Sequence, residues 1–122
     1  MRKIKIILAS RPKMISDVIR NIIEHQLDMT IVGEVIDPIS LLYAIRETSV
    51  DVVIMTPIKA NGEPKICSHL LAEHPSIIIV ALAANGETAY LYKLGAPRLC
   101  IEDPSGQSII IAIREALLAI AG

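Results

Sequence analysis

Apolar residues occur along this chain in two alternating patterns. Short continuous runs rich in isoleucine and valine are followed by longer segments in which apolar residues recur every three or four positions. The first pattern is typical of strands buried on both faces, and the second of amphipathic helices. The runs predict strands at residues 4–9, 29–36, 50–55, 77–82 and 98–101. The periodic segments predict helices after residue 12 to about 26, at about 38–45, 64–73 and 86–94, and from residue 103 onward.

Capping residues support several of these helix boundaries. Asp37-Pro38 and Asp103-Pro104 each fit an N-cap followed by proline at the first helical position. Gly95 fits the residue that follows the end of the predicted fourth helix. Five strands alternating with five helices, joined by short right-handed connections, predict a doubly wound α/β domain over residues 1–122. We expect a flavodoxin-like (βα)5 fold with a five-stranded parallel sheet of order 2-1-3-4-5.

Composition fits this fold and argues against several functional classes. Hydrophobic residues make up 52% of the chain, but the only aromatic residues are three tyrosines, so aliphatic side chains must fill the core. Twelve basic and thirteen acidic residues form no basic block, which argues against direct nucleic-acid binding by this domain. The longest apolar stretch, residues 77–84, is too short to span a membrane, and no signal peptide is recognisable, so we expect a cytoplasmic protein.

The reactive side chains form no metal or redox motif. Cys67 and Cys100 have no metal-binding spacing and are expected to be small buried residues. The three histidines share no helical face with carboxylates or cysteines, so solvated or locally bonded histidines are expected.

A series of short motifs runs along the whole chain in a characteristic order. They are Arg11-Pro12, residues 31–35 (IVGEV), residues 51–55 (DVVIM), Glu73-His74-Pro75 and Leu94-Gly95-Ala96. In this order they resemble the receiver domain of bacterial two-component response regulators, of the type that precedes a helix-turn-helix effector of the NarL/LuxR class. In that family, an acidic pair after strand one and an aspartate ending strand three hold Mg²⁺. The aspartate accepts a phosphoryl group, which a hydroxyl after strand four and a lysine after strand five then hold.

The residues aligned with this phosphorylation site do not carry the required groups. The resemblance places Ala9 and Ser10 at the acidic pair, Thr56 at the phosphoacceptor, Ala83 at the hydroxyl and Glu102 at the lysine. Mg²⁺ prefers charged oxygen ligands, which alanine, serine and threonine do not offer. A carboxylate in place of the lysine would repel a phosphate. We therefore expect a degenerate pseudo-receiver that binds no metal or cofactor and undergoes no conventional phosphotransfer.

Two charged residues are expected near each other at the carboxyl ends of the strands. Arg11 follows the first predicted strand and Glu102 follows the last. We hypothesise that they form an ion pair that replaces the family's lysine–carboxylate contact with reversed polarity. Two separately solvated charges are the equally open alternative.

Apolar residues on the predicted last helix indicate a contact surface. Ile111 and Leu118 are seven residues apart and lie opposite the helical stripe expected to face the core. Tyr90 and Tyr92, in the predicted fourth helix, cannot both face the core. Scattered surface apolar residues are the alternative. The resemblance implies a dimer face on helix four, strand five and helix five, so we expect a homodimer or a partner protein there. The expected interface residues are Tyr90, Tyr92, Leu99, Ile111, Arg114 and Leu118.

Three functions remain open from the sequence. The first is a phosphorylation-independent interaction or dimerisation module of a signalling or transcription regulator, whose DNA binding would belong to an effector domain absent from these residues. The second is a sensor that binds a small molecule at the strand ends, where Ala9, Thr56 and Ala83 make the expected pocket less polar. An enzyme of flavodoxin-like fold ranks last, because no residue pair provides an activated nucleophile or a positioned base.

Overall fold

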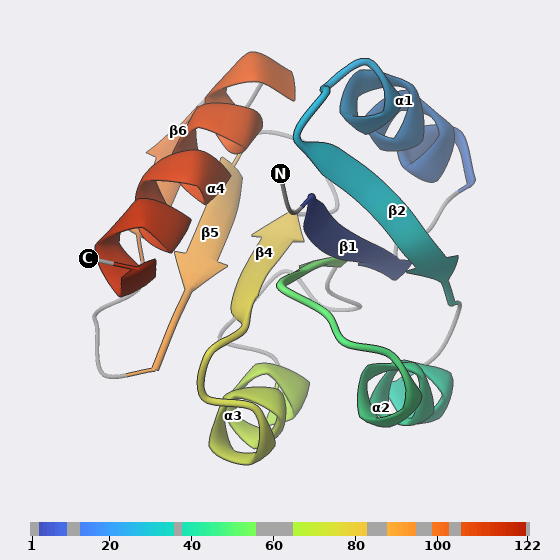
Figure 1. Cartoon of the computed structure of the whole chain (residues 1–122), viewed down its shortest axis with the longest axis vertical. Helices are drawn as coiled ribbons and strands as arrows, with labels where there is room; N and C mark the ends of the chain where they lie inside the picture. Colours follow the sequence, from blue (N-terminus) through green and yellow to red (C-terminus); the bar gives the residue numbers. More distant parts are fainter. Residues whose placement is uncertain are drawn as a thin grey trace.

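The computed structural model describes residues 3–9, 13–35, 38–55, 65–82, 88–94, 99–102 and 106–121. It contains a six-stranded sheet with helices on both faces (Figure 1). The helices α1 and α4 lie on one face, and α2 and α3 lie on the other. The helix bounds are α1 (Lys13–Glu24), α2 (Pro38–Glu47), α3 (Lys65–Glu73) and α4 (Gly106–Ala121).

The sheet has the strand order β2-β1-β3-β4-β5-β6. The strands are β1 (Ile4–Ala9), β2 (Met29–Glu34), β3 (Val52–Met55), β4 (Ile78–Leu82), β5 (Thr88–Tyr92) and β6 (Leu99–Glu102). The first four run parallel to one another, whereas β5 is antiparallel to both β4 and β6. The predicted α/β class and the order 2-1-3-4 are confirmed, but the sheet is mixed and has one strand more than expected.

The predicted fourth helix, residues 86–94, is wrong, because this part of the chain contains β5. Thr88, Tyr90 and Tyr92 alternate with Ala89 and Leu91, which is the two-residue period of a strand. β-Branched and aromatic residues also favour strands. The strand predicted at residues 98–101 is present as β6, but it lies beside β5 rather than beside β4.

Alternating side chains of the central strands divide the core into two apolar clusters. Ile6 and Leu8 of β1 contribute to the cluster under α1 and α4, whereas Ile7, between them, contributes to the cluster under α2 and α3. Ile54 and Val53 of β3 divide in the same way. Both faces of the central strands are therefore buried, as their continuous apolar sequences predict.

Asp51 fixes the relative positions of the three central strands at their amino ends. Its side-chain Oδ2 accepts a hydrogen bond of 2.9 Å from the Lys5 backbone N–H. Its own N–H donates to the Lys5 carbonyl at 2.9 Å, and its carbonyl accepts from the Ile78 N–H at 3.0 Å. This polar residue at the start of an apolar strand therefore connects β1, β3 and β4. Among the helices that the structure describes, none is long and apolar enough to cross a membrane.

Candidate functional site: the strand ends and the face around α4

The carboxyl ends of the three central strands lie side by side and are apolar. Ala9, the last residue of β1, pairs with Met55, the last residue of β3, and Met55 pairs with Ala81 of β4. Met55 and Leu82 are only 7% and 8% exposed, and Ala9 is half-buried. At these three ends, the last described side chains therefore offer no oxygen ligand to a cation.

Most of the predicted phosphorylation-site positions fall outside the described residues. This holds for Ser10, Thr56 and Ala83, whereas Glu102 is described through its backbone as the last residue of β6. Arg11, predicted to pair with Glu102, also lies outside the described residues. The ion pair between Arg11 and Glu102 therefore remains a prediction. Within the described part of the chain, no group of three or more histidine, cysteine, aspartate or glutamate residues is arranged to hold a metal ion.

The residues predicted to form an interface have different environments. Leu99 and Ile111 are 52% and 51% exposed. Tyr92 is buried and Tyr90 is half-buried, and their rings lie 6.4 Å apart, centroid to centroid, on one face of β5. Both tyrosines belong to the apolar cluster under α2 and α3, so the predicted exposed helical tyrosines are replaced by tyrosines packed in the core. The side chain of Leu118 lies outside the described residues.

Arg114, also predicted at the interface, makes strong contacts within its own chain. Its Nε donates to Asp28 Oδ2 at 3.0 Å, and its Nη2 donates to Asp28 Oδ1 at 2.7 Å and to Gln26 Oε1 at 2.8 Å. The hydrogen bond from Arg114 lowers the pKa of Asp28 below its usual value of 3.8, and the same bond raises the pKa of Arg114. These contacts hold α4 against the turn between α1 and β2.

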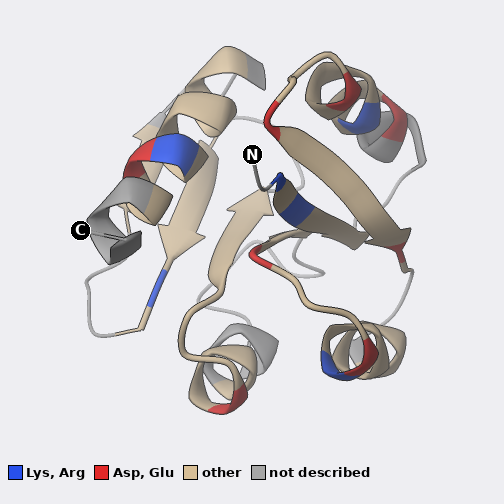
Figure 2. Cartoon of the chain, viewed as in Figure 1, with Lys and Arg blue, Asp and Glu red and all other residues tan. Residues whose placement is uncertain are grey.

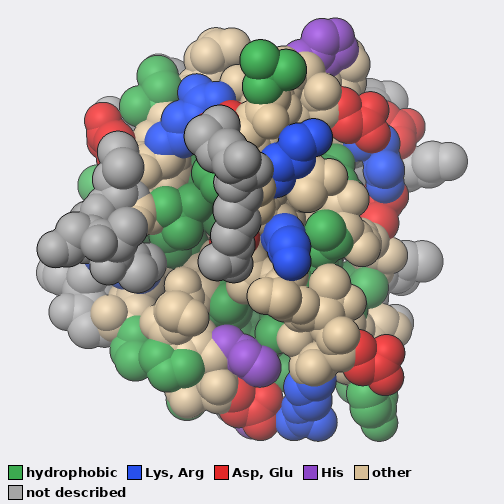
Figure 3. All heavy atoms as spheres, in the orientation of Figure 1, with side chains coloured by type: hydrophobic (Ala, Val, Ile, Leu, Met, Phe, Trp, Pro, Cys, Tyr) green, Lys and Arg blue, Asp and Glu red, His purple; other side chains and the backbone are tan. Residues whose placement is uncertain are grey.

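Charges of both signs are interspersed on the described surface. Figure 2 shows basic and acidic residues next to one another on α1, α2 and α4. On the face seen in Figure 3, hydrophobic side chains lie among charged ones. On these helices, acidic residues lie beside the basic ones, unlike in a basic stripe that binds nucleic acid.

An ionic cluster that the sequence did not predict joins α2 to α3. Arg46 Nη2 lies 3.0 Å from Glu73 Oε1, and His69 Nε2 lies 3.5 Å from the same oxygen. The expectation that no histidine shares a helical face with a carboxylate was therefore wrong for His69, because His69 and Glu73 are four residues apart on α3. The Nε2 atom of His74 is buried without a hydrogen-bond partner. His25 bonds through Nδ1 to the Asn21 carbonyl at 2.6 Å, as a locally bonded histidine would.

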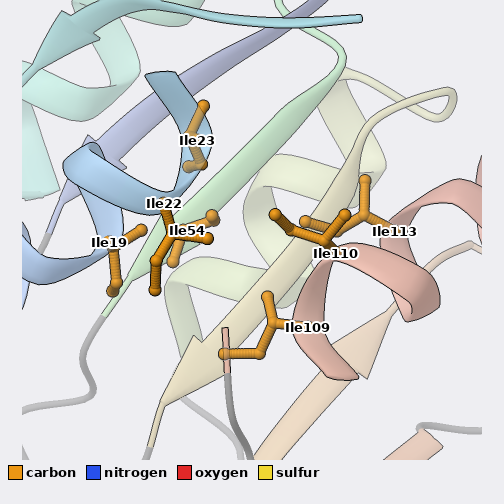
Figure 4. Close-up of a pocket in the computed structure, with 7 residues that line it drawn as sticks. All are labelled: Ile19, Ile22, Ile23, Ile54, Ile109, Ile110 and Ile113. Carbon is orange, nitrogen blue, oxygen red and sulfur yellow. The ribbon is translucent and has the colours of Figure 1, made fainter. Parts of the chain in front are cut away.

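A small apolar pocket lies between α1, β3 and α4 (Figure 4). Its volume is about 10 Å³, which is room for about one water molecule. Isoleucine side chains point into it from all three elements and offer no hydrogen bond, so it is a packing gap rather than a metabolite site. The lining residues are Ile19, Ile22, Ile23, Ile54, Ile109, Ile110 and Ile113.

Comparison with known proteins identifies the fold. No family model and no curated protein matches the sequence. The structure is similar to the RcsB response regulator of Salmonella typhimurium, with a TM-score of 0.59 and 21% identity over 68% of this chain and 44% of that one. It is also similar to the isolated REC domain of RcsB from Salmonella enterica serovar Typhimurium, solved in the presence of the phosphomimetic BeF3⁻. That match has a TM-score of 0.60 and 17% identity over 93% of this chain and 73% of that one.

A third structure, the RcsB–DNA complex, gives a TM-score of 0.60 and 17% identity over 92% of this chain and 50% of that one. At these identities the matches show the fold, which is that of a response-regulator receiver domain. The matched region spans less than half of the first RcsB chain, at 44% of its length.

Proposed function

We propose that this domain is a phosphorylation-independent pseudo-receiver of a signalling or transcription regulator. It acts by contact with another protein chain rather than by phosphotransfer. The observation that carries the proposal is the apolar character of the central strand ends, where Ala9 is opposite Met55 in the pairing of β1 with β3.

The chemistry of phosphotransfer explains why this observation matters. Mg²⁺ loses its water reluctantly and needs oxygen ligands in a near-octahedral arrangement. In the sequence, the residues that follow Ala9 and Met55 are Ser10 and Thr56, which add only neutral hydroxyls. A threonine also cannot form the acyl phosphate that a carboxylate forms with the phosphoryl group of a kinase histidine.

The RcsB structures support a role in a larger regulator. One of them contains two RcsB dimers bound to two parallel DNAs, and the chain of the first match is more than twice as long as the region matched here, which covers 44% of it. By analogy, we assign DNA binding to an additional domain and self-association or partner binding to this one. The mixed charges on its described surface are consistent with this division (Figure 2).

Incubation with acetyl phosphate and Mg²⁺, followed by intact-mass analysis, tests the proposal. We expect no added phosphoryl group and no rise in thermal stability with BeF3⁻. The REC domain of RcsB, which was solved with BeF3⁻, serves as the positive control. An acid-stable but hydroxylamine-labile phosphoryl group on this chain would overturn the proposal, because that lability identifies an acyl phosphate.

The second candidate function is small-molecule sensing at the strand ends. The same apolar residues, Ala9, Met55 and Leu82, favour it, because apolar side chains at the strand ends suit a neutral metabolite better than an ion. The test is a thermal-shift screen of neutral metabolites. A compound that raises the melting temperature of the native protein should no longer raise that of Ala9→Asp. A hit that Ala9→Asp leaves unchanged would place the ligand elsewhere.

A further inference from the structure

The strand β6 forms one edge of the sheet that the structure describes. It is last in the strand order, and no described strand pairs with its outer side. Leu99 is 52% exposed, and Cys100 is also exposed, so the expectation that Cys100 is buried was wrong. An edge strand with apolar side chains and free backbone N–H and C=O groups is a template for another strand.

The pairing of β6 with β5 shows which side chains face each side of the sheet. Leu99 is opposite Leu91 and Ile101 is opposite Ala89, and both partners belong to the cluster under α4. Directly opposed residues point to the same face of a sheet, so Leu99 and Ile101 face the α4 side. Cys100 is opposite Tyr90 and faces the other side. An added strand would therefore extend both apolar faces.

The sequence of this segment is complementary to itself when two copies run antiparallel. It reads Arg98-Leu99-Cys100-Ile101-Glu102. In the register that opposes Cys100 to Cys100, Leu99 is opposite Ile101 and Arg98 is opposite Glu102. In the sequence these two unlike charges flank the three residues between them, so this register opposes unlike charges at both ends of the paired segment.

We propose that two copies of this domain associate by antiparallel pairing of their β6 strands, with Cys100 opposite Cys100. The inference rests on the proposed function, because it specifies the protein contact through which the domain acts. It joins the two six-stranded sheets into one continuous sheet.

The arrangement leaves room for the helices on the α4 side. In the joined sheet the two β4 strands, on which the α4 helices pack, are five strand spacings apart, or about 24 Å. A helix with its side chains is about 10 Å wide, so the two α4 helices do not collide.

Cys100 provides a direct test of the register. In Cys67→Ser, the only remaining cysteine is Cys100. Diamide would accept two electrons and two protons from two thiols, which leaves a disulfide between two chains. We expect a covalent dimer whose formation follows the fraction of non-covalent dimer. As a matched control, Cys67→Ser/Cys100→Ser/Val32→Cys moves the thiol to the other edge strand, where we expect no dimer in the same time. Equal cross-linking from both edges would overturn the proposal.

Charge reversal tests the pairing without oxidation. Arg98→Glu and Glu102→Arg each oppose like charges at both ends of the paired strands. Each should raise the dissociation constant in sedimentation roughly three- to tenfold. The double variant opposes unlike charges again and should restore association. Loss of folding is excluded by circular dichroism. A double variant no better than the single variants would overturn the proposed register.

Apolar edge variants separate this inference from the proposed function. Leu99→Lys should dissociate the dimer, whereas Val32→Lys on β2 should not. If Ile111→Glu dissociates a dimer that Leu99→Lys leaves intact, β6 pairing is wrong, while a pseudo-receiver acting through α4 stands. A protein that remains monomeric at every concentration also overturns β6 pairing. An acyl phosphate on this chain overturns the proposed function but leaves the β6 experiments unaffected.

Discussion

The sheet has an edge strand at each end, β2 at one and β6 at the other, and the two differ in how well other parts of the chain cover them. At one end, α1 packs on β2, and Arg20 of α1 forms an ion pair with Glu34, the last residue of β2. The pairing of β1 with β2 also shifts register between Ile6 and Ile7, an irregularity that discourages further strand addition. At the other end, β6 (Leu99–Glu102) exposes Leu99 and Cys100. The comparison indicates that one end stabilises the monomer and that the other is available for contacts.

The largest expected effect comes from cavities placed beneath the helices at the two ends. Ile113 of α4 and Ile23 of α1 are 0% and 1% exposed. Replacing either with alanine should cost about 2–5 kcal/mol in the free energy of unfolding, measured by denaturant titration. Hydrogen exchange should then differ, with Ile113→Ala weakening protection mainly in β5 and β6, and Ile23→Ala mainly in β2.

Ile111→Ala is the matched control for this pair, because Ile111 lies on α4 but is 51% exposed. Its effect should stay within about 0.5 kcal/mol. If Ile113→Ala and Ile23→Ala gave identical hydrogen-exchange patterns, the two ends of the sheet would not respond independently.

A smaller effect is expected from the contact that joins the two ends. Arg114 of α4 binds Asp28, which directly precedes β2, and this lowers the pKa of Asp28 below 3.8. The Asp28 carboxylate therefore binds a proton more readily in the unfolded chain than in the folded one. The stabilisation is complete above the unfolded pKa and is lost as the pH falls through the folded pKa. Asp28→Asn should reduce the loss of stability between about pH 5 and about pH 2, measured by urea unfolding.

Arg114→Gln should reduce the same acid dependence, because it removes the cation that lowers the pKa of Asp28. An unchanged acid dependence in both variants would mean that this pair does not connect the ends energetically.

The smallest effect is expected from the ion pair that covers the β2 edge. Arg20 and Glu34 are each about one-third exposed, at 35% and 36% of the side chain. A double-mutant cycle with Arg20→Ala and Glu34→Ala should give a coupling of about 0.2–1 kcal/mol that falls with added salt. The cycle of Arg20 with Glu24, at 3.8 Å in the same helix, is the control and should give no larger coupling. A coupling insensitive to salt would point to packing rather than charge.

The fold was predictable wherever the apolar pattern had one interpretation. Continuous runs such as residues 52–55 and 78–82 are buried along their whole length, so their pattern leaves little alternative to central strands. Residues 88–92 were misassigned because the expected alternation of strand and helix outweighed their own two-residue period. Gly95 reinforced the error by resembling the end of a helix.

The candidate site was less predictable from sequence than the fold. The exposure of Ile111 was predicted, because Ile111 lies opposite the apolar stripe by which α4 faces the core, and it is confirmed. The side chain of Arg114 could not be placed in the same way, because its partner Asp28 is 86 residues away in the sequence. Tyr90 and Tyr92 were placed at the surface because a helix cannot bury two residues spaced by two on one face, but a strand can.

The strand β5 also bears on whether phosphotransfer could be regained. Because β5 lies between β4 and β6, the carboxyl end of β6 is two strand spacings from β4, about 10 Å instead of about 5 Å. In the family that the sequence resembles, the lysine at the position of Glu102 must reach a phosphate held on the third strand. Glu102→Lys would restore the positive charge, but its ammonium group would start one strand spacing farther from the third strand. On the alignment that the resemblance implies, substitutions at these positions alone would leave β5 between β4 and β6.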